Sequence, residues 1–218
     1  MTGKLFLSIR DARSAFWVLL ALAAIIASAG AVADSDATVI GAMIVAPLMT
    51  PILGSALALI LADRRRLLAS VALVVGGGVV VVVLECLLGL LTPEPVVAAT
   101  NSQVAGRVDP KLIDLVAALA TGAVGAFALV RADVSDTLPG VAIAISLVPP
   151  LAVVGLTLES GAPDQAAGAL LLFATNVSAI IATGTTVLLA YRVRASADAA
   201  GWPVGTLRAG RWRSWAPR

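Results

Sequence analysis

The sequence predicts an all-α, polytopic membrane protein with six transmembrane helices. Of the 218 residues, 60% are hydrophobic and only 13% are charged, which exceeds the apolar share of ordinary soluble domains. The apolar residues gather in six runs of about 20 residues, each long enough to cross the roughly 30 Å hydrocarbon core of a bilayer as a helix. The runs lack the alternating polarity of membrane β-strands, so a barrel is not expected.

The expected spans follow one another along almost the whole chain. They cover residues 14–33, 39–61, 67–91, 112–130, 138–158 and 166–191. We therefore expect one membrane domain over residues 14–191, with a first half at 14–91 and a second half at 112–191. Residues 1–13 precede this domain, residues 92–111 connect its halves, and residues 192–218 form a basic tail.

The lysines and arginines predict the orientation, because short loops rich in these residues stay in the cytoplasm. All but two of the 15 basic residues lie before the first span, after the second, fourth or sixth span, or in the tail. The exceptions are Arg107 and Lys111, in the connection between the third and fourth spans. This asymmetry predicts a multi-pass protein of the cell inner (plasma) membrane, with both termini cytoplasmic and residues 92–111 extracytoplasmic.

The first span has a second interpretation as a signal peptide. It has a basic start, an apolar run, and small residues at Ala31 and Ala33 before Asp34, which together resemble a cleavage site. The apolar run is longer than a usual signal core, which favours a retained helix. N-terminal sequencing of the purified protein distinguishes the two.

The second span contains two helix breakers. The stretch GAMIVAPLMTPILG, residues 41–54, places Pro47 and Pro51 near its middle. In a straight helix Pro47 would clash with the carbonyl of Met43, and Pro51 with that of Pro47, at a cost of about 3 kcal/mol or more each. The freed carbonyls then need neighbouring helices, trapped water, or a bound ion or solute.

The fifth span repeats this interruption. In ISLVPPLAVVG, Pro149 and Pro150 lie near the midpoint, and sliding Gly41 onto Gly140 brings Pro51 onto Pro150. Spans one to three and four to six would then form two inverted three-helix repeats. Paired, proline-interrupted helices in two inverted halves indicate a transport site at the membrane midplane. Prolines that only serve helix packing are the alternative.

Two polar residues inside apolar runs are further candidates. Glu85 is the only acidic residue well inside a span, and a charge at the bilayer centre costs about 2.5 to 3.5 kcal/mol on insertion scales. Asn176 lies mid-span among threonines and serines, where residues 175, 178, 182 and 185 form a polar edge able to hydrogen-bond other helices. Asn176 could contact a solute or pack against another helix. Glu85 could have a functional role in a cavity, or could be a protonated or snorkelling side chain without one.

These stretches resemble a known family. GAMIVAPLMTPILG, ISLVPPLAVVG and LLFATNVSAI are similar to the membrane core of the bacterial family catalogued as domain of unknown function 389, and the resemblance runs from Thr38 to Tyr191. The resemblance implies a fold but does not indicate an activity.

The remaining composition excludes several classes of function. The chain has no histidine and one cysteine, Cys86, so histidine-based catalysis, imidazole zinc sites and an internal disulfide are excluded. We expect no enzyme, no cofactor, no metal and no nucleic-acid partner. The expected partners are the lipid bilayer, a small ion or polar solute, and further copies of the chain. The function expected is a transporter or channel with its site at the proline breaks; a membrane scaffold without transport is the alternative.

The candidate binding residues are accordingly Met43, Pro47, Pro51, Glu85, Pro149, Pro150 and Asn176.

Overall fold

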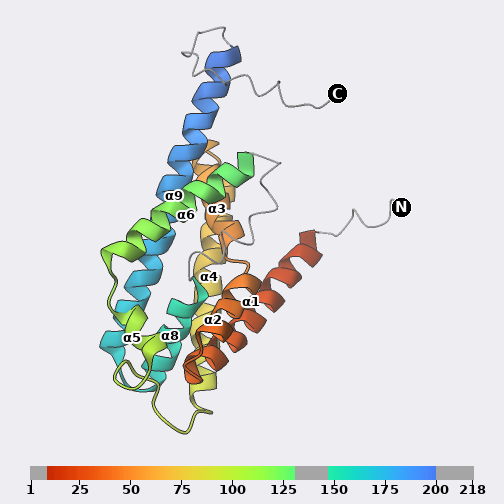
Figure 1. Ribbon diagram of the computed structural model, residues 1–218. Coiled ribbons are helices and arrows are strands. Elements are labelled where there is room, and N and C mark those ends of the chain that lie inside the picture. Colours follow the sequence, from red (N-terminus) through yellow and green to blue (C-terminus); the bar gives the residue numbers. More distant parts are fainter. Residues whose placement is uncertain (1–8, 131–146, 200–218) are drawn as a thin grey trace, which may run out of the picture.

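The computed structural model describes residues 9–130 and 147–199, and within these ranges the chain is helical and contains no strand (Figure 1). The helices are α1 (Ile9–Val32), α2 (Asp36–Val45), α3 (Met49–Ile60), α4 (Arg64–Gly89), α5 (Ser102–Val108), α6 (Leu112–Val130), α8 (Val148–Glu159) and α9 (Pro163–Ala199). The expectation of an all-α membrane-type fold is confirmed for these residues.

Four described helices are long and apolar enough to cross a membrane: Ser14–Val32 within α1, all of α4 and α6, and Pro163–Tyr191 within α9. The pair α2 and α3 counts as a fifth span if the two helices, bent by 48° at their break, are taken together. The expected fifth span is seen only as α8, a 12-residue apolar helix, because residues 138–146 lie outside the described ranges. The count of six spans and the inverted repeat thus stay predictions.

Two half-helices start at the same level of α4. Leu48, just before α3, packs over Gly77 of α4, and Leu151 in the first turn of α8 packs over the adjacent Gly78. A Cβ added at these glycines would lie 3.4 Å and 3.7 Å from the two leucine side chains. Both helix starts therefore pack against adjacent positions of α4.

From this level the two half-helices run in opposite directions along α4. Gly54 of α3 faces Ser70, towards the start of α4, whereas Glu159 at the end of α8 lies against Gly89, the last residue of α4. Both half-helices also pack against α9, and α6 packs against α9 beside α3 (Figure 1). The half-helices thus share two supports, α4 and α9.

The core joins the two breaks. One cluster of buried side chains includes Leu48, Met49, Leu147, Val148 and Leu151, which flank the two helix starts. A second buried cluster links α8 to α5 and to the start of α9 at one end of the molecule, called here the α5 end. Apolar side chains on the outer faces of α4 and α6 are exposed, as expected for surfaces that contact lipid.

The expected connection over residues 92–111 contains structure that the sequence analysis did not predict. Asn101 starts α5 by accepting a hydrogen bond from the backbone N–H of Val104 at 3.0 Å. Its side-chain amide donates to the carbonyl of Ala31, the last turn of α1, at 2.6 Å. Because the Asn101 side chain bonds both the first turn of α5 and the last turn of α1, it holds these two helix ends together.

Candidate functional site

The break in the second span lies at Pro47. Ala46 is extended (φ −67°, ψ 124°), as the residue before a proline prefers, and α2 ends there. The expected interruption of the span is present at Pro47, whereas Pro51, also expected to break the helix, lies within α3. It is the third residue of α3, where no backbone donor is needed within the helix, and its carbonyl accepts a hydrogen bond from the Ser55 hydroxyl at 2.9 Å.

The expected second break falls at the start of α8, and the residues before Leu147 lie outside the described ranges. Pro149 and Pro150 are the second and third residues of this helix and both are buried. Pro150 and Pro51 thus occupy the same position in two half-helices, as the alignment of Gly41 with Gly140 predicts. Met43, in α2, and Pro47, in the α2–α3 break itself, are half-buried.

Apolar side chains surround the meeting point of the breaks. Leu48, Val148 and Leu151 are at most 1% exposed. The two breaks therefore meet in a packed, apolar environment. Any polar solute at this level requires a different arrangement of the half-helices.

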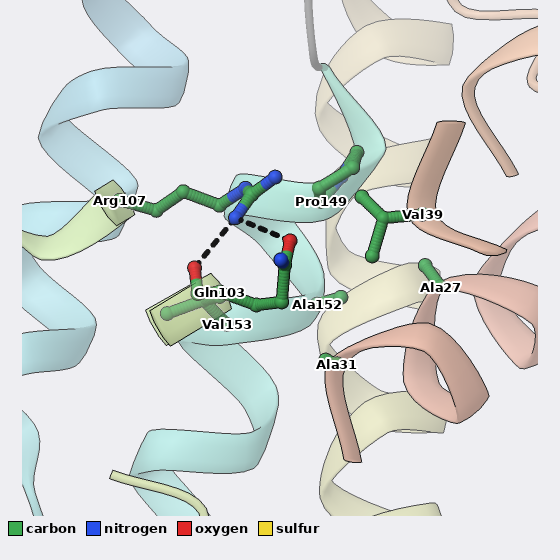
Figure 2. Close-up of a pocket in the computed structure, with 8 residues that line it drawn as sticks. All are labelled: Ala27, Ala31, Val39, Gln103, Arg107, Pro149, Ala152 and Val153. Atoms are coloured by element: carbon green, nitrogen blue, oxygen red, sulfur yellow. Dashed lines mark hydrogen bonds between the residues drawn. The ribbon is translucent and has the colours of Figure 1, made fainter. Parts of the chain in front are cut away.

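A narrow pocket reaches Pro149 from the α5 end (Figure 2). It has no room for a whole water molecule in this conformation. Its walls are small or apolar residues of α1, α2 and α8, and Gln103 and Arg107 extend into it from α5. The lining residues are Ala27, Ala31, Val39, Gln103, Arg107, Pro149, Ala152 and Val153.

Hydrogen bonds hold Arg107 in place over this pocket. One terminal nitrogen, Nη1, donates to the backbone carbonyl of Gln103 at 2.6 Å and to its side-chain oxygen at 3.0 Å (Figure 2). The Gln103 amide in turn donates to Asp36 at 2.6 Å. Burial lowers the pKa of Arg107, and the negative charge of Asp36 opposes this shift. The Nε of Arg107 is buried and has no hydrogen-bond partner.

Asp34 anchors the start of α5 beside this network. One carboxylate oxygen accepts hydrogen bonds from the Ser102 hydroxyl at 2.8 Å and from the backbone N–H of Gln103 at 3.0 Å. These bonds stabilise the charged form and hold the pKa of Asp34 below its ordinary value of 3.8. The connection is thus attached to the end of α1 by several independent bonds.

Glu85 lies inside the helix bundle, away from this network. Its side chain is fully buried, between α1 and α8. The buried Ser28 hydroxyl of α1 approaches the carboxyl group, yet neither oxygen of Glu85 has a partner at hydrogen-bonding geometry. Gly155 of α8 packs so closely on the Cβ of Glu85 and the carbonyl of Val82 that no larger residue fits there.

Asn176 is also buried, at 5% exposure, and its side-chain oxygen has no hydrogen-bond partner. It shares a face of α9 with the buried Phe173 and Ile180. Of the predicted polar edge, Thr175 and Thr185 are half-buried, whereas Ser178 and Ala182 are exposed, so hydrogen bonding of this edge to other helices stays a prediction. The Thr175 hydroxyl donates to its own helix, at the carbonyl of Leu171.

The structure therefore divides the predicted site residues into separate groups. The prolines gather at the breaks, Glu85 lies between α1 and α8, and Asn176 lies on α9. Gln103 and Arg107, which reach Pro149 through the pocket, were not predicted. The available signal was Arg107 itself, one of two basic residues in otherwise acidic connections on that side.

Helices of this length and apolarity, with buried breaks between them, define an integral membrane protein of the helical class. The model of the family described as "Domain of unknown function (DUF389)" matches residues 43–182, more than half of the chain. The chain belongs to this family.

A relative supports the same assignment. Over 176 residues, 81% of this chain, the sequence is 32% identical to the "Uncharacterized protein MJ0678" of Methanocaldococcus jannaschii. The chain spans about half the length of this relative, 54%. The relative is archaeal, so the bacterial origin implied by the resemblance is not confirmed. No solved structure matches the chain.

Proposed function

We propose that this protein moves a small ion or polar solute across the membrane, along a path that crosses the bundle where α3 and α8 start on α4. The observation that carries the proposal is the opposed pair of half-helices. The starts of α3 and α8 pack against two neighbouring glycines of α4, Gly77 and Gly78. From that level the two half-helices run in opposite directions. Transporters with inverted halves use such interrupted helices to bind their substrates at the midplane.

The electrostatics of the helix ends support this location. The first turns of α3 and α8 carry the partial positive charge of a helix N-terminus, and the end of α2 carries the opposite partial charge. Polar backbone groups at this depth are tolerated where protein buries them or where they line a path for solute. The packed apolar side chains over them then correspond to a closed state.

The entrance to this path lies at the α5 end. By the distribution of basic residues, we assign this end to the outside of the cell inner membrane and both termini to the cytoplasm. The pocket at Pro149 is closed by Gln103 and Arg107, which are held by hydrogen bonds on a single short helix. A displacement of α5 would open the pocket towards the start of α8.

Buried polar atoms without partners support a role beyond packing. Glu85 and Asn176, both singled out by the sequence, carry oxygen atoms that no described group satisfies. Buried polar groups are normally paired, so unpaired ones call for a specific explanation such as a bound ion or water. We assign both residues to solute or ion contact in another state of the cycle.

A scaffold without transport is the second candidate, and the packed apolar contact between the breaks favours it. In that case the outward edge of α9, with Thr175 and Ser178, would contact another copy of the chain. A second copy is also compatible with transport, so oligomeric state does not separate the two candidates.

Reconstitution separates them. Purified protein in sealed vesicles is tested for passage of a panel of inorganic anions, cations and small neutral solutes. Transport predicts saturable passage of at least one solute class above protein-free vesicles. Passage of none, with correctly inserted protein, supports the scaffold.

A further inference from the structure

Glu85 is the ionisable side chain that the described part of the molecule buries most completely. Its exposed fraction is 0%, and both carboxyl oxygens lack a hydrogen-bond partner. A carboxylate in this position would be a buried charge without compensation, which proteins avoid by neutralising the group. Bound to a proton, the same group is neutral and can remain among apolar neighbours.

The groups around Glu85 leave the proton as its partner. From α1 the Ser28 hydroxyl faces it, and from α8 the backbone of Gly155 packs on it. On α4 itself, the Cys86 thiol donates to the Gly155 carbonyl at 3.2 Å. The nearest further acid is Glu159, one turn along α8 and packed on Gly89. None of these described neighbours is a basic residue.

The proton also has a short route to the pocket. Ala27 and Ala152 line the pocket from α1 and α8, whereas Ser28, the next residue of α1, and Gly155, one turn further along α8, contact Glu85. The contact between α1 and α8 therefore separates the pocket from Glu85. Small residues form this layer, so a modest separation of the two helices connects them.

We propose that Glu85 takes up and releases a proton through the contact between α1 and α8, and that this exchange couples solute movement to protons. The proposal rests on the proposed transport function for its coupling step. Proton binding at Glu85 does not depend on the transport function, because proton exchange there can be measured without a known solute.

The experiment uses dicyclohexylcarbodiimide, an apolar reagent that reacts with protonated carboxyl groups inside membranes. The carboxyl O–H adds across one C=N bond, and an acyl shift gives a stable N-acylurea that keeps all atoms of both partners. The full-length protein in lipid vesicles is labelled at neutral and at alkaline pH, and the modified peptide is identified by mass spectrometry. We expect labelling at Glu85 that falls several-fold at alkaline pH.

Two variants provide the controls. Glu85→Gln removes the label, whereas Glu159→Gln, which changes the neighbouring acid, keeps it. Failure of Glu85 to react in wild-type vesicles at neutral pH, with reaction restored by denaturation, would overturn the proposal. Labelling that is equal at all pH values would also overturn it, because the proton would then never leave.

Infrared spectroscopy gives an independent readout on the wild-type protein. The carbonyl stretch of a protonated Glu85, identified by its absence in Glu85→Gln, is expected to shift on transfer to D₂O. A band that stays unshifted shows a buried acid that does not exchange, and contradicts the proposal. Each of these results stands whether or not the vesicles pass a solute, so failure here is distinct from failure of the transport function.

Discussion

Pro51 and Pro150 occupy the same position, the third residue, in two half-helices that start on neighbouring glycines of α4 and run in opposite directions. A proline in the first turn is compatible with the helix that follows it, because its missing N–H needs no partner within that turn. The two prolines are therefore accommodated at equivalent helix starts, while the break before α3 lies at Pro47.

Replacing Pro149 and Pro150 together by alanine is expected to lower solute flux. Without the two rings, both positions regain a backbone N–H, so α8 can extend towards its N-terminus and close the break. We expect a fall of about tenfold, equivalent to about 1.4 kcal/mol on the barrier, with normal membrane insertion. Flux in reconstituted vesicles measures it. Pro163→Ala, at the exposed start of α9, is the matched control and should leave flux unchanged.

Replacing Gly155 by alanine is expected to destabilise the protein by about 1–3 kcal/mol, the usual cost of overpacking. The added methyl group would collide with Glu85 Cβ and with the carbonyl of Val82. Thermal unfolding in detergent measures the change. Gly41→Ala, where nothing lies within 4 Å of an added Cβ, is the control. Equal stability of the two variants would show that α4 and α8 do not pack as described.

The attachment of α5 is expected to weaken in acid. Because hydrogen bonds hold the pKa of Asp34 below 3.8, its contribution is complete above that ordinary value and is lost as the pH falls through the lowered one. Hydrogen exchange at the amide of Gln103, which donates to Asp34, should be protected until that range is reached. In Asp34→Asn the acceptor remains but does not titrate, so this acid-dependent step should be absent.

Removing the Arg107 side chain is expected to open the pocket. With Cys86 replaced by alanine, a cysteine at Val39 on the pocket wall reports access to a membrane-impermeant thiol reagent. Arg107→Ala should raise its labelling rate several-fold, since the largest side chain over the pocket is gone. Arg107→Lys retains a long basic side chain and should change the rate less. Unchanged labelling in Arg107→Ala would show that Arg107 does not close the pocket.

Much of the fold follows from local sequence. Long apolar runs predict α1, α4, α6 and α9, because their length and hydropathy are properties of each segment alone. The position of the α2–α3 break was assigned less well. Pro47 and Pro51 look equivalent in a helical run, yet only Pro47 follows a residue in extended conformation, and Pro51 falls in a first turn where its missing donor has no effect.

The site was less predictable because it depends on contacts between distant segments. Glu85 and Asn176 could be nominated, since a polar residue in an apolar run is visible in the sequence, and both are buried. The closure of the pocket by Gln103 and Arg107 depends on how α5 packs against α8 and α9, which residues 92–111 alone do not reveal. Likewise, the outward position of Ser178 depends on which face of α9 meets α3 and α8.

The most direct test of the transport path is the accessibility of Ala152, which is 1% exposed and lies next to the break at the pocket wall. A single cysteine at this position, with Cys86 replaced by alanine, is exposed in sealed vesicles to impermeant thiol reagents added from one side or the other. A transport path that opens alternately to the two sides of the membrane predicts slow but measurable labelling of this cysteine from each side. Labelling from neither side, with full reaction after denaturation, would contradict the account.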